Sequence, residues 1–509
     1  MLRQSITVYL LSRFLALFMC YKESVIYNLI LKLAARIKDI FEKSLVHWLF
    51  TSETSYEKKY RQSVIYAIID KLVRFLEKWG NAYWTLARKS SENSVCVKVF
   101  NVFHDTGYFK FEYICGLLFG FMLVVPHEMW NNLYAVIMAV LLAGLYVLLH
   151  FSGRKFAFNI RAVSVSIIAF LVAVAGGVLK TPVLYDGARI ALFYISSVIF
   201  AVVIWGSVSD EKTLKILVTM LIGGLTVMCL YALYQNHVGV EIDVRLTDIS
   251  ANSGMPGRVY STFANPNNFA EAIVLIVPFV YTMILCSGKK ITKALFSAVL
   301  VLCLVALAMS YSRSCYVAFA IATLVFVFIY DWRLILPLGI VAIMCIPILP
   351  ESVMNRIFTI GSLSDSSNSY RTLVWEGVIN LVKNTGISGI GIGPEAFTRL
   401  YPKYANMSAL TAMHSHMLYL EVFVELGIVG FLGFMGIMYS SLKKGLSVVN
   451  RTNKTIRCFI ISCISAFAGI SFTACAEYIW FYPRVMFLFW IVLGVLLACV
   501  RISRKRITE

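Results

Sequence analysis

Long apolar runs separated by short polar stretches dominate the chain. A helix needs roughly 20 apolar residues to cross the hydrocarbon of a bilayer, and runs near this length recur through most of the sequence. We expect about twelve membrane-spanning helices, at residues 112–126, 132–151, 162–179, 189–207, 214–236, 267–287, 294–311, 314–330, 334–349, 417–441, 458–476 and 485–500. The pattern predicts an all-α, polytopic membrane protein.

Composition supports the same class. Hydrophobic residues make up 59% of the 509 residues and charged residues only 14%, whereas soluble domains are about 25% charged. The net charge of +19 indicates cytoplasmic loops rich in Lys and Arg and contact with anionic lipid. No nucleic-acid-binding motif accompanies this charge, so we expect no nucleic-acid partner. The 12 scattered cysteines form no CxxC pair, and we interpret them as buried apolar residues.

Residues 1–110 differ from residues 111–509, which we predict to be the membrane domain. Apolar residues recur there at helical spacing, for example Ile68, Leu72 and Phe75, between basic residues. This pattern predicts a cytoplasmic segment of basic amphipathic helices. Two interpretations stay open. The helices lie on the membrane surface against anionic lipid, or they pack their apolar faces on each other.

The distribution of Lys and Arg predicts the orientation of the spans. The basic loops all fall on one side of a twelve-span arrangement, at about residues 154–161, 212–215, 289–293 and 443–457. We assign that side to the cytoplasm, with both termini there. The loops near 237–266 and 350–416 then lie outside the cytoplasm, and the second is the long extracytoplasmic loop.

Few arginines fall on the extracytoplasmic side, and each one calls for an explanation. They are Arg189, Arg245, Arg258, Arg313, Arg356, Arg371, Arg399 and Arg484. A solvated loop holds an arginine at no cost, which is our interpretation of Arg245 and Arg356. Arg313 lies instead between two apolar spans, where a charge usually faces a polar cavity or an anion.

A possible anion site with a base beside it lies on this face. His414 and His416 stand where the long loop meets a predicted span, a position that suits a general base. The alternative is that they are ordinary interfacial residues. Arg258, Arg313 and Arg371 lie on the same face, and the planar guanidinium group binds phosphate in a bidentate manner.

Metal-assisted chemistry is not expected. Asp365 and Glu395 are isolated, and no DxD motif occurs on this face, so we predict charge neutralisation by arginine, without a metal or a cofactor. Gly389, Gly391 and Gly393 resemble a phosphate loop only superficially, since no GK[ST] sequence follows them. We predict a turn or a re-entrant segment there.

These stretches, taken in order, resemble the O-antigen ligase and polymerase family of bacterial inner membranes over about residues 185–495. The resemblance is carried by Arg258-Val-Tyr-Ser-Thr-Phe-Ala-Asn-Pro-Asn-Asn, Ser312-Arg-Ser, Tyr370-Arg-Thr-Leu-Val-Trp, the Gly-Ile-Gly-Ile-Gly-Pro run and His414-Ser-His-Met-Leu-Tyr-Leu-Glu. One departure concerns Met417, because the family often has Asn at this position.

The resemblance implies a metal-independent glycosyltransferase of the GT-C type. Its donor would be a glycan on undecaprenyl diphosphate, and its acceptor a saccharide or a lipid-anchored saccharide. Negative charge grows on the departing diphosphate during transfer, and preplaced arginines stabilise such charge. By this resemblance Arg258 and Arg313 contact the diphosphate, and His416 removes the proton of the acceptor hydroxyl.

The remaining site residues follow from the same resemblance. Arg371 is a third diphosphate partner or an acceptor contact, and His414 orients its neighbour His416. Asn267 and Tyr370 are expected to bind substrate.

Other functions remain open at this point. A ligase and a polymerase share the donor and differ in the acceptor, and the sequence does not separate them. A transporter or flippase for a lipid-linked sugar or a small anion also fits many spans, although the candidate charges gather at one face and not along a path through the midplane. A structural membrane component without catalysis is the third alternative.

Overall fold

The structure is a computed structural model of the chain. It describes residues 62–91, 93–105, 110–151, 165–241, 256–360 and 366–508, together with scattered positions between 28 and 59. Every regular element in these residues is a helix, which confirms the all-α prediction. The elements are α5 (Val64–Ser91), α6 (Val95–Asp105), α7 (Phe111–Val124), α8 (Leu133–Phe151), α9 (Val165–Lys180), α10 (Leu184–Ser207), α11 (Glu211–Val238), α12 (Pro266–Cys286), α13 (Lys290–Met309), α14 (Arg313–Asp331), η4 (Trp332–Leu334), α15 (Ile335–Cys345), η5 (Ile346–Ile348), α16 (Glu351–Phe358), α17 (Ser366–Thr385), α18 (Pro394–Leu400), η6 (Tyr401–Lys403), η7 (Met407–Ala409), α19 (Leu418–Val448), α20 (Lys454–Thr473) and α21 (Pro483–Thr508).

The chain divides into two compact units. One comprises Met1–Ser63 and Val327–Ile348, and the other comprises Val64–Phe326 and Leu349–Glu509. The second unit contains all the candidate site residues. The predicted boundary near residue 110 between a cytoplasmic segment and a membrane domain stays a prediction.

The apolar helices match the predicted spans closely. Nine helical runs of the described residues are long and apolar enough to cross a membrane. Two further apolar helices, α7 and α9, are shorter and coincide with the predicted spans 112–126 and 162–179. The described part of the chain is therefore that of a polytopic membrane protein, as predicted.

One of the nine runs, Arg313–Ile348, covers two of the predicted spans. Its two ends lie together, since Leu349 packs on the cluster of Tyr311 and Val353. The chain thus leaves this place at Arg313 and returns to it at Leu349. The predicted spans 314–330 and 334–349 are both helical within this run.

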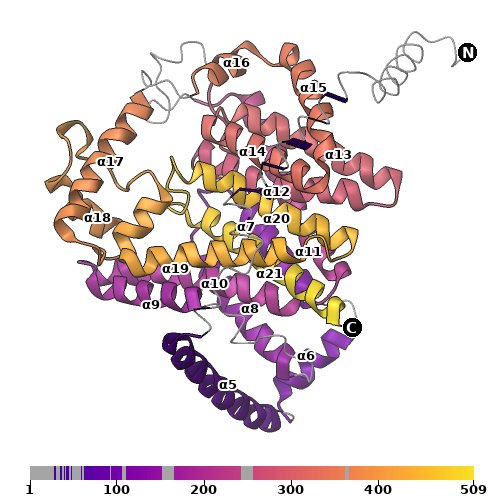
Figure 1. Cartoon of the computed structure of the whole chain (residues 1–509), viewed down its shortest axis with the longest axis vertical. Coiled ribbons are helices and arrows are strands. Elements are labelled where there is room, and N and C mark those ends of the chain that lie inside the picture. The colour runs from indigo at the N-terminus through magenta and orange to yellow at the C-terminus, as the bar shows by residue number, and fades with distance from the viewer. Residues whose placement is uncertain are drawn as a thin grey trace, which may run out of the picture. The chain divides into compact units, whose positions relative to one another are not determined.

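Extensive pairwise packing builds the bundle of the second unit (Figure 1). Helix α10 packs along α21, α12 along α20, α9 along α19 and α7 along α11. Small residues let these helices approach closely, as in other membrane bundles. A Cβ atom at Gly494 would come within 2.8 Å of the carbonyl oxygen of Ala201. Helices α12, α20 and α21 are largely buried, whereas α8 and α13 expose most of their surface.

The predicted loop 350–416 is largely helical and has a core of its own. Helix α17 contributes Val374 and Val378, and α18 with η6 contributes Phe397 and Tyr401, all of them buried. The rings of Phe397 and Tyr401 stack with centroids 4.8 Å apart. The chain passes through this small core between α17 and the start of α19, where the candidate histidines lie.

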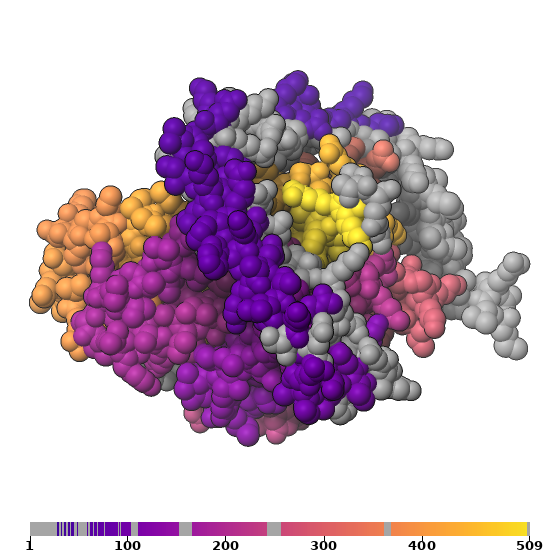
Figure 2. Space-filling model, turned by 90° about the horizontal axis from the view of Figure 1, so that it is seen from below, coloured from indigo at the N-terminus to yellow at the C-terminus, as the bar shows by residue number. Residues whose placement is uncertain are grey.

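Helix α5 keeps its apolar side chains exposed. Ile68, Leu72 and Trp79 each expose more than half of their surface, and Figure 2 shows this helix in indigo on the surface seen from below. Trp84 packs on Phe151 at the end of α8, with ring centroids 4.8 Å apart. Contact with anionic lipid stays a prediction, and most of the first 61 residues lie outside the described residues.

Candidate functional site

The motif loops meet at one end of the bundle, which we call the motif face. It comprises residues 256–265, 310–312, 413–417 and 474–482. Backbone hydrogen bonds join these loops, since the Val259 amide donates to the Met309 carbonyl at 3.3 Å and the Leu418 amide to the Ala474 carbonyl at 2.9 Å. Segments far apart in the sequence therefore form one surface.

Three of these loops hold a residue in the left-handed backbone region. Ser261, Tyr311 and His416 have φ angles of 53°, 51° and 52°, and they are the non-glycine residues with positive φ among the described residues. Such conformations cost about 1–3 kcal/mol each and gather at functional sites. Ser261 and His416 lie within sequence motifs that predicted the site, and Tyr311 directly precedes the Ser312-Arg-Ser motif.

Arg258 is buried at the motif face and held from two sides. Its Nε donates to the Ser310 carbonyl at 2.9 Å, and its Nη2 donates to Asn267 Oδ1 at 2.6 Å. Burial, and to a smaller extent the nearby Arg356, lowers the pKa of this guanidinium to about 10, so the group stays charged at neutral pH. A buried, fixed cation of this kind suits an anionic ligand.

Asn267 is placed by the start of α12. The Asn265 side chain caps this helix by accepting the Asn267 amide at 2.8 Å, and Pro266 occupies the first helical position, where its missing N–H costs nothing. Asn267 then joins two parts of the site, because its Nδ2 donates to Glu477 Oε1 at 3.0 Å.

Glu477 connects Arg258, in the loop before α12, to Arg371 of α17. The same Oε1 atom that accepts from Asn267 also accepts from Arg371 Nη2, in an ion pair. Both members of the pair are mostly buried, at 14% and 17% exposure. The result is a continuous hydrogen-bonded series, which runs from Arg258 through Asn267 and Glu477 to Arg371 (all of them within the described residues).

The two histidines lie next to this series, and their tilted rings contact each other. Their ring centroids are 4.2 Å apart, and the His416 amide donates to His414 Nδ1 at 3.1 Å. The ring of Tyr370 meets that of His416 edge-on at 5.8 Å. Nδ1 of His416 is buried and has no hydrogen-bond partner among the described residues.

The loop that carries the histidines is anchored to α19. The Ser415 amide donates to Glu421 Oε2 at 2.6 Å, and the Ser415 hydroxyl donates to the Met417 carbonyl at 2.9 Å. Met417, which departs from the family pattern, is the N-cap residue of α19 and makes no side-chain cap. Glu421 thus fixes the backbone between His414 and His416.

Both histidines are neutral in this setting. Burial lowers the pKa of His414, and the neighbouring His416 and Arg371 lower it further. Burial also lowers the pKa of His416, while the Glu477 carboxylate acts in the opposite direction and Arg371 adds to the lowering. A neutral imidazole can accept a proton, as a general base must.

The arginines near the 310–312 turn form a second group. Arg313 Nη1 donates to the Thr359 carbonyl at 3.1 Å. Arg356 Nε donates to the Tyr311 carbonyl at 3.0 Å, and the residue is only 7% exposed. The interpretation of Arg356 as a solvated loop arginine was therefore wrong, because its helix α16 packs on Tyr311 through Val353.

The glycine-rich run is a turn, as predicted. It docks where α19 is broken at Gly427, whose φ of 68° and ψ of −170° are not helical. The amides of Ile390 and Gly391 donate to the freed carbonyls of Val424 and Glu425, at 2.8 and 3.2 Å. These N–H groups are already bonded, so the run does not have the open amides of a phosphate loop.

Most of the predicted site residues come together. Direct contacts link Arg258, Asn267 and Arg371 through Glu477, and ring contacts link His416 to His414 and Tyr370. Arg313 lies beside the same turn as Arg258, where its Nη1 donates to the Thr359 carbonyl. Their catalytic and substrate-binding roles stay predictions.

Sequence reasoning missed two members of the site. Glu477 stands in the short loop between α20 and α21, and its signal was a single acidic residue on the predicted extracytoplasmic side. Arg356 was seen in the sequence and explained as a solvated residue. Two other arginines of this face have partners of their own, since Arg484 donates to the Val125 and Thr262 carbonyls at 2.8 Å and Arg189 pairs with Asp186.

An all-α membrane protein with histidine, arginine and glutamate gathered at one end of its bundle is the class that this fold and site define. Residues 298–435 match the family described as O-Antigen ligase. This match agrees with the resemblance predicted from the motifs and supports a role in glycan transfer in general. The match includes Arg313, Arg371, His414 and His416. No curated protein matches the chain.

Proposed function

We propose that this protein transfers a glycan from undecaprenyl diphosphate to a saccharide acceptor at the motif face. The observation that carries the proposal is the buried series from Arg258 to Arg371, joined by Asn267 and Glu477 and lying beside His416. It combines fixed positive charge with a neutral imidazole, the two features that transfer from a lipid diphosphate requires.

The proposed step forms one bond and breaks another at the anomeric carbon of the donor sugar. The acceptor oxygen attacks this carbon, and its proton passes to His416. The bond from the carbon to the diphosphate oxygen breaks, and the electron pair leaves on that oxygen. A single displacement of this kind inverts the anomeric centre.

Arginine balances the charge of the leaving group in this proposal, without a divalent cation. Arg258 is the principal contact, because its guanidinium is buried, charged and fixed by the Ser310 carbonyl. Arg313 and Arg356 flank the same turn and extend the positive surface. Arg371 is held by Glu477, so it contacts the acceptor side or a second phosphate oxygen.

Glu477 is a positioning residue in this proposal. Its carboxylate holds Arg371 and Asn267 and favours the protonated form of His416, which develops as the acceptor loses its proton. His414 supports the His416 ring and accepts its backbone amide.

The location follows from the same proposal. The motif face is placed on the extracytoplasmic side of the bacterial cytoplasmic membrane, where a lipid-linked glycan is presented. Both termini are then cytoplasmic, and the basic loops contact anionic lipid.

The test is to replace His416 by Ala in the native host and to size both the envelope glycan and the lipid-linked donor. Loss of product with accumulation of donor, in a protein expressed at wild-type level, supports the proposal. Single repeat units left on the carrier indicate a polymerase, and long chains left on the carrier indicate a ligase. Unchanged glycan and donor contradict the proposal and favour the alternative of a transporter for lipid-linked sugar.

A further inference from the structure

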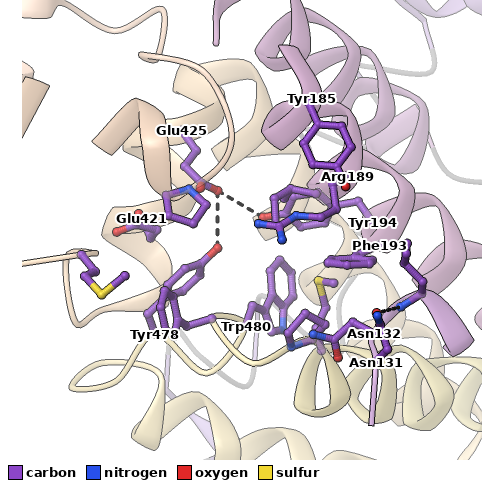
Figure 3. Close-up of a pocket in the computed structure, with 17 residues that line it drawn as sticks. Asn131, Asn132, Tyr185, Arg189, Phe193, Tyr194, Glu421, Glu425, Tyr478 and Trp480 are labelled. Atoms are coloured by element: carbon purple, nitrogen blue, oxygen red, sulfur yellow. Dashed lines mark hydrogen bonds between the residues drawn. The ribbon is translucent and has the colours of Figure 1, made fainter. Parts of the chain in front are cut away.

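A cavity of about 310 Å³ lies beside the loop that carries the histidines, since Met413 belongs to its wall (Figure 3). Its wall comes from the start of α8, the start of α10, helix α19 and the loop between α20 and α21. None of Arg258, Arg313, Arg371 and His416 belongs to this wall. The cavity is therefore separate from the residues to which the proposed function assigns the chemistry.

A single layer of aromatic rings separates the cavity from His414, the neighbour of the proposed base His416. The His414 ring contacts those of Phe481 and Tyr478, with centroids at 4.5 and 5.6 Å, and both of these aromatic residues line the cavity. On its other side the His414 ring contacts His416 at 4.2 Å. The wall of the cavity is thus linked to the proposed base through the His414 ring.

The wall combines flat aromatic surface with carboxylates. In Figure 3 the ring of Trp480 lies between Tyr478 and Phe193, below Glu425. Glu425 Oε2 accepts from the hydroxyls of Tyr194 and Tyr478 at 3.3 and 3.4 Å. Both distances are long for O–H···O hydrogen bonds.

One buried donor in the wall has no acceptor. Trp480 is 3% exposed, and its Nε1–H finds no partner among the described residues. Buried polar groups in proteins are nearly always hydrogen-bonded, and a small shift of the Trp480 ring within the wall would bring this donor to a ligand in the cavity. Glu421 contributes a further carboxylate, of which Oε2 is bonded to the Ser415 amide.

The mouth of the cavity carries a cation. Arg189 exposes 43% of its side chain and pairs with Asp186 at 2.7 Å, and Figure 3 shows its guanidinium turned toward Tyr194 and Trp480. Its planar group keeps donors available beyond the one bonded to Asp186. The cavity therefore offers an arginine, two carboxylates and several rings within one small volume.

We propose that this cavity binds one sugar unit of the glycan, next to the sugar that reacts. The apolar face of a sugar ring packs on flat aromatic side chains, and its hydroxyls need donors and acceptors around the edge. The volume is at the lower end of the roughly 300–1,000 Å³ of ligand sites, which suits a single ring.

The proposal rests on the proposed function for the identity of the ligand, and its test separates the two. The probe is the set of oligosaccharides released by mild acid from the host's own envelope glycan. These are titrated against the purified full chain carrying His416→Ala, with binding followed by saturation-transfer NMR. Turnover is absent from this experiment, so binding is measured independently of catalysis.

Two substitutions test the wall of the cavity. Trp480→Phe keeps a ring and removes the orphan donor, and Arg189→Ala removes the cation at the mouth. Each should weaken binding about three- to tenfold, as expected for one hydrogen bond. Arg399→Ala is the matched control, because Arg399 is similarly exposed and pairs with Glu395 one turn earlier outside the cavity wall.

Binding that is unchanged in the double variant Arg189→Ala, Trp480→Phe contradicts the proposal. Absence of any oligosaccharide binding to a chain with the wild-type thermal transition contradicts it as well. Saccharide binding without any transfer by the wild-type chain would leave the cavity assignment standing and refute the proposed function.

Kinetics of the same variants with His416 intact identify the source of the sugar. A raised KM for the lipid-linked donor assigns the cavity to the donor glycan, and a raised KM for the acceptor assigns it to the acceptor. A change in neither KM, with Arg399→Ala as the reference, contradicts a sugar site.

Discussion

Replacing Glu477 by Gln tests the hydrogen-bonded series at its centre. The amide is nearly isosteric with the carboxylate and still offers Oε1 to Asn267 and Arg371. What it removes is the negative charge between the arginines and His416. The variant should therefore fold normally and lose activity for an electrostatic reason.

The size of the effect follows from the contacts of Glu477. A hydrogen bond to a charged group contributes about 1.5–3 kcal/mol, and a neutral one about 0.5–1.5 kcal/mol. Glu477→Gln weakens the bond to Arg371 by about 1–1.5 kcal/mol, which corresponds to about a tenfold loss in kcat/KM. Glu477→Ala removes the bonds to both partners, for a total of about 3 kcal/mol and a loss on the order of 100-fold.

The pH dependence separates this account from a purely structural role. The Glu477 carboxylate opposes the lowering of the His416 pKa that burial causes. Without that charge the pKa of His416 falls further, so the base stays neutral to lower pH. The acidic limb of the profile of kcat/KM against pH should move to lower pH in Glu477→Gln.

The assay is glycan transfer in membranes that contain equal amounts of each variant, measured across the pH range. Glu376→Gln in α17 is a matched control, because it makes the same change on the same unit outside the series. A kcat/KM within twofold of wild type in Glu477→Gln, together with an unmoved acidic limb, would refute the reasoning.

Further expectations concern the glycine turn, Arg258 and the base. Gly389→Ala should lower the melting temperature and cost about 3 kcal/mol of folding free energy, because φ is 77° and a Cβ would come within 2.6 Å of the Gly427 amide nitrogen. Gly386→Ala is the control, since this glycine has the same φ but open space around it. It should cost only about 1 kcal/mol. Arg258→Lys should reduce kcat/KM at least tenfold, since an ammonium group cannot reach both the Ser310 carbonyl and Asn267, and equal activity would contradict the role of Arg258. Transfer by the wild type should stay high as pH falls to about 6.5, because His416 has a lowered pKa; an acidic limb above this pH would contradict a buried base.

The sequence predicted which face of the membrane domain carries the site, because motif order and span order together place residues far apart on one end. Arg258, Asn267 and Arg371 come from three segments, and the structure joins them. The joining residue was not predictable, since Glu477 is a lone carboxylate in a short loop and its role depends on the register of α20 against α12.

Backbone geometry was also beyond sequence patterns. Nothing in the residue types of Tyr311 or His416 indicates a positive φ, which neighbouring loops impose. The break of α19 at Gly427 had a signal, a glycine inside an apolar span, but its use as an acceptor for the Gly389 turn depends on tertiary contact. Residues 350–416 contain no apolar run long enough for a span, so they were predicted as a loop. The apolar residues that form the core of this segment are spaced too irregularly to predict its helices.

The most direct test of the central claim uses purified chain in proteoliposomes with the host's lipid-linked glycan and an acceptor saccharide. The account predicts that wild-type protein forms the transferred product, and that His416→Ala, reconstituted in equal amount, forms it at least about 100-fold more slowly. Product formation by His416→Ala at the wild-type rate, or movement of the lipid-linked glycan across the bilayer without any product, would contradict it.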